Sequence, residues 1–385
     1  MMKKSIFALA VASVLTLGAA QAETVLYGSI RYDYENSKNK NTLFDAKDDA
    51  KRLSNLNDAG SRIGLKGSED LGNNNAVIYN LEYGFDGMTT DENNSKFTTR
   101  LAVLGLTGDW GTVTAGRQHN PFKQTIVDGS VQDDFNGGNV ISNASQRAMT
   151  TTLNGVLSAK VDTNGDLVID EEKTLENGLG NKAQYARVGK VIAYTTPDFA
   201  GFSANAAMMM DSSKYGVNDE KNIDLWTINA KYAYDLGANG ALLAKAGYIQ
   251  GKLADKGKSK AWGLFLGYSQ DAFAVSASYA DGNHKAQFPG IEGKGPKEKS
   301  KGWDLGASFS FGPNYFSTVR ATYGQSQVKV EDAKSKVKSW AVGFEQKLST
   351  RTRGWVEYGN EKTTIKHVGG SAKSNVISIG MRHDF

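Results

Sequence analysis

Apolar and polar residues alternate with a period of two over many short segments of the chain. In one of them Ile63 and Leu65 fall on one face of an extended backbone, while Arg62 and Lys66 fall on the other. The same alternation recurs in the segments 77–83, 224–235, 303–311 and 377–385. A period of two is typical of β-strands that separate an apolar environment from a polar one.

Long polar tracts and short joints alternate between these segments. We expect strands at 24–35, 59–70, 75–86, 96–107, 111–118, 184–196, 201–210, 222–235, 240–251, 260–270, 272–284, 301–311, 315–328, 335–349, 351–363 and 373–385. The polar tracts are 36–58, 86–96, 119–150, 160–183, 211–222, 251–260, 284–301 and 364–373, and the short joints include 71–72, 107–111, 197–201, 236–240 and 312–314. Bacterial outer-membrane barrels likewise have short turns at one end and longer loops at the other. The pattern therefore predicts an all-β fold, a transmembrane antiparallel β-barrel of about 16 strands with an aqueous lumen.

The mean hydropathy of the chain, −0.44, is that of a soluble protein. An alternating strand has a low average hydropathy even when one of its faces contacts lipid, so this value does not exclude a membrane barrel. No segment beyond the N-terminal region approaches the ~18 consecutive apolar residues of a membrane helix. If the chain spans a membrane, it must do so as a closed barrel, because lipid cannot satisfy the open edge of a sheet.

The N-terminus has the features of a secretory signal peptide. Lys3 and Lys4 precede a short apolar run and a small-x-small site. This pattern predicts cleavage after Ala22, which removes residues 1–22 and leaves 23–385 as a single barrel domain. A buried N-terminal helix is the alternative.

Charge and cysteine content exclude several classes of function. Removal of the signal peptide lowers the 45 basic residues by two, against 41 acidic residues, so the mature chain has a net charge of about +2. This balance gives no basis for nucleic-acid binding, which needs a concentrated basic surface. The chain has no cysteine, so disulfides, thiol catalysis and cysteine-based metal sites are excluded.

No group of residues has the spacing of a catalytic site. The four histidines lie far apart in the sequence, at His119, His284, His367 and His383, and no Gly-x-Ser-x-Gly motif is present. A Ser/Asp/His site assembled from distant residues is the alternative, since outer-membrane proteases and phospholipases are barrels too. We expect no enzyme activity and no cofactor.

The tract 162–172 places acidic or amide oxygens at alternate positions, as a calcium-binding loop does. Leu167, however, stands where the glycine of the sharp turn belongs, and Lys173 stands where the bidentate glutamate belongs. We therefore expect a solvated acidic external loop and no metal site. Divalent-cation binding in this loop is the alternative.

Several segments together resemble the Gram-negative general (non-specific) outer-membrane porin family. They are 25–29, 61–72, 99–106, 108–111, 115–118, 194–202 and 380–385, and they follow one another along the whole mature chain. The block Ser-Arg-x-Gly-Leu-Lys-Gly-x-Glu-Asp-Leu-Gly is the most specific of them. The resemblance implies a homotrimer of sixteen-stranded barrels, each with an inward-folded third external loop. The last strand, which ends in Phe385, also looks like the signal read by the barrel-assembly machinery.

The long tract after the fifth expected strand matches the third external loop of the family. It carries Asp128, Asp133 and Asp134, which the resemblance assigns to the acidic side of the pore constriction. The segment 134–138 resembles the family's acidic-Phe-Gly-Gly turn. Asp133 replaces a proline there and Asn136 is inserted, so the geometry of the loop tip departs from the family pattern.

Basic residues are expected on the barrel wall that faces this loop. Arg62, Arg100 and Arg187 match the basic ladder of the family, and Arg31 and Lys66 lie in phase nearby. Opposite charges on the two sides set a field across the narrowest part of the pore, which orients dipolar solutes and biases ion selectivity. Because the wall arginines outnumber the loop aspartates, we expect a weak anion preference. The alternative is that these residues are ordinary solvated charges of the lumen.

Arg117 is in phase with Val113 and Ala115, on the apolar face of its strand. A charge that faces lipid near the bilayer centre costs ~2–4 kcal/mol, so Arg117 needs a partner. In the family an acidic residue of the second loop contacts the adjacent subunit near this arginine, and here that loop offers Asp91 and Glu92. We predict a trimer contact between them. An arginine at a strand end that reaches the lipid headgroups is the alternative.

We therefore expect a porin, a passive diffusion channel for ions and small hydrophilic solutes across the Gram-negative outer membrane. A substrate-selective channel is one alternative, although most aromatic residues fall on the outward face. An adhesive or structural barrel with a blocked lumen is another. The lysine-rich tracts 252–260 and 294–301 are expected to be solvated external loops, with contact to the lipopolysaccharide surface as the alternative.

Overall fold

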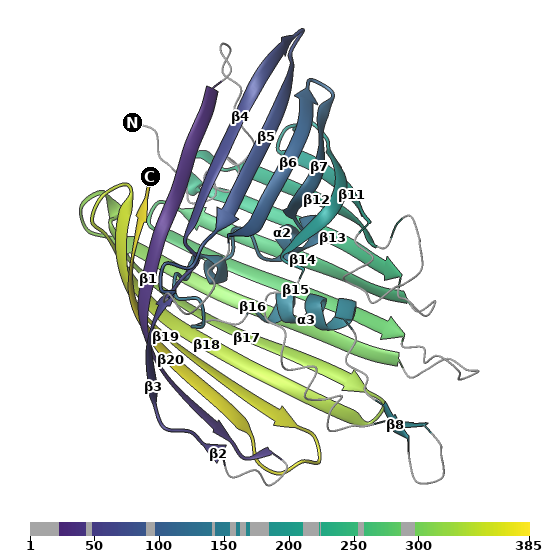
Figure 1. The fold of residues 1–385 in the computed structure, drawn as a ribbon, viewed down its shortest axis with the longest axis vertical. Helices are drawn as coiled ribbons and strands as arrows, with labels where there is room; N and C mark the ends of the chain where they lie inside the picture. The colour runs from purple at the N-terminus through teal and green to yellow at the C-terminus, as the bar shows by residue number, and fades with distance from the viewer. Residues whose placement is uncertain are drawn as a thin grey trace.

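The strands of the computed structural model form one closed, tilted barrel (Figure 1). The structure describes residues 23–43, 48–89, 97–140, 143–154, 159–161, 167–169, 185–210, 223, 225–252, 258–285 and 297–385. Sixteen antiparallel strands make the wall, namely β1 (Glu23–Asn41), β4 (Arg62–Gly72), β5 (Asn75–Gly84), β6 (Thr98–Gly108), β7 (Gly111–His119), β10 (Arg187–Thr195), β11 (Phe202–Met209), β12 (Leu225–Asp235), β13 (Ala241–Lys252), β14 (Lys258–Gln270), β15 (Phe273–Lys285), β16 (Lys297–Phe311), β17 (Ser317–Val330), β18 (Ala333–Lys347), β19 (Thr352–Ile365) and β20 (Ala372–Asp384). Two short strands, β2 (Asp48–Asp49) and β3 (Leu53–Asp58), extend the sheet beside β1. The sixteen strands predicted from the sequence are confirmed.

The first and last strands close the barrel. β1 pairs with β4 on one side and with β20 on the other, so Ser29 lies opposite both Arg62 and Asp384. The backbone amides of Gly28 and Phe385 each donate to the other's carbonyl oxygen, at 3.0 and 3.1 Å. A closed sheet has no unpaired edge, which is the condition for crossing lipid with strands.

The strands expose apolar side chains on their outer face and place small or polar side chains on their inner face. In β14, Leu264 and Leu266 are 48% and 57% exposed, whereas Ser259 and Gly263 are buried. A soluble protein would bury such leucines, because a large apolar surface in water is unfavourable. The exposed apolar face is therefore the face that contacts lipid.

Tryptophan and tyrosine side chains form a belt on this outer face, near the end that carries the long loops. Their ring centroids are 5.2 to 5.5 Å apart in four pairs of nearly the same geometry, Trp226–Tyr248, Trp262–Tyr279, Trp303–Tyr323 and Trp340–Tyr358. We call these eight residues the aromatic girdle. Because tryptophan and tyrosine favour the boundary between lipid tails and headgroups, the girdle marks one edge of the membrane.

The connection between β7 and β10, the third at the long-loop end, packs against the inner wall. It contains α2 (Pro121–Ile126), η2 (Val131–Asp134) and α3 (Ala144–Asn154), and Figure 1 shows α2 and α3 within the ring of strands. The two helices contact β11 to β17. Four of their apolar side chains are fully buried, Phe122, Ile126, Met149 and Leu153. The third loop therefore occupies part of the lumen, as the resemblance implies.

Three tracts expected to be external loops are partly strand. β1 continues to Asn41 and pairs with β3, so much of the tract 36–58 is paired backbone. β14 begins at Lys258 and β16 at Lys297, inside the loops that were expected before them. These extensions are polar because they project beyond the aromatic girdle, where lipid tails no longer require apolar side chains.

Other predictions concern segments that the structure describes only in part or not at all. β8 (Ala159–Val161) and β9 (Leu167–Ile169) form a small hairpin within the tract 160–183. The expected signal peptide and most of the candidate calcium loop lie outside the described residues. No described helix has both the length and the apolar character needed to cross a membrane.

Replacement of Gly302 by valine should displace α3 from the wall. A Cβ atom at this position would lie 2.0 Å from the carbonyl oxygen of Ala144, and such overpacking costs ~1–3 kcal/mol. We expect a folded barrel, judged by its heat-dependent migration in electrophoresis, with larger and noisier single-channel conductance. Gly369→Val is the control, because nothing lies within 4 Å of a Cβ atom there. Unchanged conductance in Gly302→Val would contradict this packing of α3.

Candidate pore constriction

Arg31, Arg62 and Arg100 converge on one stretch of the inner wall. Glu82 of β5 lies between two of them, with Arg100 Nε 2.5 Å from Glu82 Oε1 and Arg62 Nε 3.6 Å from Glu82 Oε2. Arg31 Nε donates to Ser29 Oγ at 2.7 Å. Glu82 was not among the site residues predicted from the sequence, although it shares the polar phase of its strand. This carboxylate neutralises part of the positive charge.

The two remaining predicted wall residues behave differently. Arg187, at the start of β10, is close enough to Arg100 and Glu82 to interact with both electrostatically. Lys66 instead lies over the ring of Tyr27, with its ammonium nitrogen 5.3 Å from the ring centroid. The structure therefore brings Arg187 to the arginines and leaves Lys66 apart from them.

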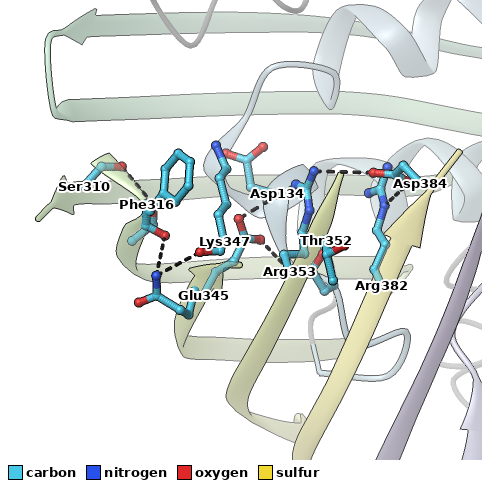
Figure 2. A network of polar contacts seen from close by, with 12 residues as sticks. Asp134, Ser310, Phe316, Glu345, Lys347, Thr352, Arg353, Arg382 and Asp384 are labelled. Carbon is cyan, nitrogen blue, oxygen red and sulfur yellow. Dashed lines mark hydrogen bonds and ion pairs between the residues drawn. The ribbon is translucent and has the colours of Figure 1, made fainter. Parts of the chain in front are cut away.

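Three further arginines, which were not predicted from the sequence, extend this group of arginines along the inner wall. Arg382 of β20 lies directly opposite Arg31 on one side and Arg353 of β19 on the other. Asp384 accepts from both neighbours, from Arg382 Nε at 2.6 Å and from Arg353 Nη2 at 3.5 Å (Figure 2). The inward phase of the last strand could have identified Arg382, because it follows the outward-facing Met381.

The third of these arginines, Arg320 of β17, is held by two carboxylates. Its Nη2 is 3.4 Å from Glu345 Oε2, and its Nη1 is 3.5 Å from Glu357 Oε1. Glu345 also lies 3.8 Å from Arg353, so acids and bases alternate along the wall (Figure 2). We call the complete set the arginine wall, which comprises Arg31, Arg62, Arg100, Arg187, Arg320, Arg353 and Arg382.

The third loop carries its own counter-charge. Lys123 Nζ lies 2.6 Å from Asp128 Oδ1 and 3.8 Å from Asp133 Oδ1. Asp134 lies beside Arg320 instead, whose Nη1 donates to the backbone carbonyl of Asp134 at 2.8 Å. Of the three predicted aspartates, Asp134 is therefore the one placed beside the arginine wall.

Glu357 fastens the tip of the third loop to the wall. The backbone amides of Asn136 and Gly137 donate to its carboxylate at 2.9 and 2.8 Å. The side chain of Asn136 donates to Glu345 at 2.8 Å. The residue that departs from the family pattern, Asn136, is thus the one that joins the loop tip to both carboxylates.

Asp304 of β16 fastens α3 in a similar way. The backbone amides of Ala144 and Ser145 both donate to it at 2.8 Å, and the Ser145 hydroxyl donates at 2.7 Å. In the same helix, Arg147 pairs with Glu361 at 2.6 Å. A carboxylate at a helix N-terminus satisfies backbone amides that have no partner within the helix. The loop is therefore anchored to the barrel at its tip and at α3.

Burial and charge shift the pKa values of the loop aspartates in opposite directions. The protein around Asp134 disfavours the charged form of its carboxyl and raises its pKa to about 6; Arg320 opposes this shift only in part, and the residue stays exposed. Burial also raises the pKa of Asp133, with partial compensation by Lys123. Burial acts the same way on Asp128, but the Lys123 ammonium outweighs it and the pKa of Asp128 is lowered.

Arg117 lies at the outer side of β7, opposite Ala102 of β6. Its Nε donates to the carbonyl oxygen of Thr99 at 2.9 Å. Within the described part of the chain, no carboxylate pairs with Arg117. Asp91 and Glu92, the predicted partners on the adjacent subunit, lie outside the described residues, so the contact stays a prediction.

The chain matches a known family over most of its length. The family model described as Gram-negative porin matches residues 8–366. The chain belongs to the Gram-negative porin family. The porin is 26% identical to the major outer membrane protein P.IB of Neisseria lactamica and 25% identical to an outer membrane porin protein of Bordetella pertussis, each over 100% of both chains. Its match to P.IB of Neisseria sicca is 29% identical and spans 62% of this chain and 54% of that protein.

Solved structures share the fold of this porin. An anion-selective porin from Comamonas acidovorans has a TM-score of 0.64 at 20% identity and covers 95% of this chain and 100% of its own. The trimer form of OmpT from Vibrio cholerae has a TM-score of 0.62 at 12% identity, with the same coverage. Because the chain belongs to the Gram-negative porin family, it lies in the outer membrane and forms a diffusion channel, which confirms the function expected from the sequence. Its family is one of channels rather than enzymes.

The ion selectivity of the porin should depend on pH through Asp134. Because its pKa is about 6, Asp134 is ionised at pH 8 and largely neutral at pH 5. The pKa of Asp133 is also raised. Acidification therefore removes negative charge from the lumen and should move the reversal potential in a salt gradient toward anion selectivity. In Asp134→Asn the shift should be smaller, and the variant at pH 8 should resemble the native porin at pH 5. An equal pH response in both proteins would exclude Asp134 as its source.

Proposed function

We propose that this porin is a homotrimeric, non-specific diffusion channel with a weak anion preference, constricted between the third loop and the arginine wall. The balance of charge along that wall carries the proposal. The seven arginines of the arginine wall are interleaved with four carboxylates, Glu82, Glu345, Glu357 and Asp384, and two further carboxylates of β1 lie nearby, Asp33 close to Glu357 and Glu35 close to Asp33, so the positive excess is small. An excess of one sign in a narrow channel raises the local concentration of the opposite ion.

The loop side of the constriction opposes this excess only in part. Lys123 pairs with Asp128 and Asp133, so among the described residues of the loop Asp134 is the carboxylate next to the wall that has no ion pair. A solute that passes the third loop meets the negative charge of Asp134 and the positive charges of the arginine wall. Such a field aligns dipolar solutes and disfavours large apolar ones. No catalytic step is assigned to any of these residues.

The distribution of aromatic side chains favours a general channel over a substrate-selective one. A selective sugar channel needs a row of aromatic rings along the lumen. In the described strands the large exposed aromatics lie mainly on the outward face, as in Trp262, Phe309 and Phe344. The lumen offers charges, hydroxyls and glycines instead, which bind small hydrophilic solutes weakly.

The double variant Arg62→Gln, Arg100→Gln should reverse or abolish the anion preference. The substitutions remove two positive charges and leave Glu82 without its ion-pair partners. In planar bilayers with a salt gradient, we expect the native reversal potential to have the sign of weak anion selectivity and that of the variant to move toward cations. Lys51→Gln, Arg351→Gln is the matched control, because it makes the same charge change at two exposed positions outside the sixteen wall strands. A cation-selective native porin would overturn the proposed preference.

The proposed trimer rests on Arg117 at the outer side of the barrel. Arg117 donates only to a backbone carbonyl among the described residues, and a charge in this position needs a further partner. We infer that Asp91 or Glu92 of a neighbouring subunit supplies it.

Loss of this contact should weaken the trimer. Arg117→Ala and the double variant Asp91→Asn, Glu92→Gln should each lower the temperature at which the purified trimer dissociates, by removing a contact worth ~2 kcal/mol or more at a buried interface. The measurement is the fraction of trimer in electrophoresis after graded heating. The combined variant should lose no more than either alone, because both remove one interaction. Additive losses would show that Arg117 and the acidic pair act separately.

Recognition of the last strand by the barrel-assembly machinery is also part of the proposal. Phe385 lies at the short-turn end, is 41% exposed and pairs with Gly28. An exposed terminal ring beside the closing seam supports a role in assembly.

A further inference from the structure

Three alternate strands repeat one motif on their outward face. The motif is Lys-x-Lys-x-Trp, and it occurs at Lys258–Lys260–Trp262 in β14, Lys299–Lys301–Trp303 in β16 and Lys336–Lys338–Trp340 in β18. Each tryptophan belongs to the aromatic girdle, so both lysines lie beyond the membrane edge, toward the long loops. We call these six lysines the lysine belt. Five of the six are exposed, and Lys336 is partly exposed.

The strands between them complete a regular lattice. In β15, Asn283 lies directly opposite Lys260 on one side and Lys299 on the other. In β17, Gln327 lies directly opposite Lys301 and Lys336 in the same way. Directly opposed side chains have Cβ atoms ~4.5–5.5 Å apart. The outer wall thus presents two copies of a unit in which one amide stands between two ammonium groups.

Within the described residues, the positive charge of this lattice is balanced only in part by the protein around it. Two rows place three lysines directly opposite one another, Lys258–Lys285–Lys297 and Lys299–Lys329–Lys334. Like charges opposed across strands are destabilising. Among the outward-facing described residues of β14 to β19, Asp281 is the only carboxylate; it stands directly opposite Lys301 and accepts from the Tyr279 hydroxyl. No ion pair joins a belt lysine to any carboxylate of the described chain.

We propose that the lysine belt binds the phosphorylated sugar headgroup of lipopolysaccharide. The belt lies just beyond the aromatic girdle of an outer-membrane protein, at the depth of the headgroups. Phosphates would relieve the repulsion between the lysines, the amides can bond to sugar hydroxyls, and the tryptophans and leucines below can contact the acyl chains. The inference rests on the outer-membrane location of the porin and does not depend on its ion preference.

The position of the belt leaves it open to lipid. In the strand order of the closed barrel, β17 stands half-way round from β7, which carries Arg117. A subunit docked at Arg117 would therefore cover the side of the barrel that lies away from the lysine belt. A lipid in the outer leaflet is then the occupant whose charge, depth and shape fit the belt.

The test is the affinity of the whole, detergent-purified porin for fluorescent lipopolysaccharide. The double variant Lys301→Gln, Lys338→Gln neutralises the centre of the belt, and Lys301→Arg, Lys338→Arg preserves its charge. Lys51→Gln, Arg351→Gln makes the same net change outside the belt. We expect the glutamine variant to bind at least about tenfold more weakly, since lysines near an anionic lipid surface contribute additively. The arginine variant and the control should bind like the native porin.

The probes separate lipopolysaccharide recognition from general attraction to anions. Lipopolysaccharide treated to remove its phosphates should bind weakly, and phosphatidylglycerol vesicles should bind weakly to every variant. The proposal would be overturned if the belt and control variants lost the same affinity for lipopolysaccharide. It would also be overturned if dephosphorylated lipopolysaccharide or phosphatidylglycerol vesicles bound the native porin as tightly as intact lipopolysaccharide. Conductance in phosphatidylcholine bilayers verifies that each variant is folded, and ion selectivity measured there tests the channel proposal separately.

Discussion

Every backbone N–H and C=O group within the lipid must find its partner inside the protein, and the rest of the structure depends on this requirement. The pairing of β1 with both β4 and β20 meets it by leaving no open edge. Once closed, the ladder fixes the face of every side chain, because a slip of one residue would exchange the two faces of a strand. The apolar outer face and the polar lumen are therefore consequences of one hydrogen-bond register.

A barrel of sixteen strands is too wide for its wall side chains to fill, so the third loop decides what the lumen contains. Glycine at position 302 lets α3 approach the wall closely, and Asp304 and Glu357 accept hydrogen bonds from loop backbone amides. A buried carboxylate is costly unless it is hydrogen-bonded, and here the loop amides supply those bonds. The hydrogen bonds to Asp304 and Glu357 thus stabilise both the position of the loop and the two buried carboxylates.

Like charges lie close together on both faces of the barrel, but their counter-charges differ in origin. Inside, Arg31, Arg382 and Arg353 stand next to one another across strands, and fixed carboxylates such as Asp384 lie between them. Outside, the lysine rows have no such carboxylates among the described residues. On the inner face the protein supplies the counter-charge, which keeps the arginines in place for passing ions. On the outer face, according to our proposal, the phosphates of lipopolysaccharide supply counter-charge.

The sequence by itself determined the strands, their two faces and the closed barrel, because a period of two and the requirement of lipid are local or general properties of the chain. The same reasoning located Arg31, Arg62 and Arg100 on the lumen side. Only the tertiary structure showed that Arg31 is a neighbour of Arg382, since that contact depends on the closure of the barrel. It also decided that Lys123 neutralises loop aspartates and that strands continue into the lysine-rich tracts. These features follow from register and loop packing between distant segments, which a local alternation pattern does not encode.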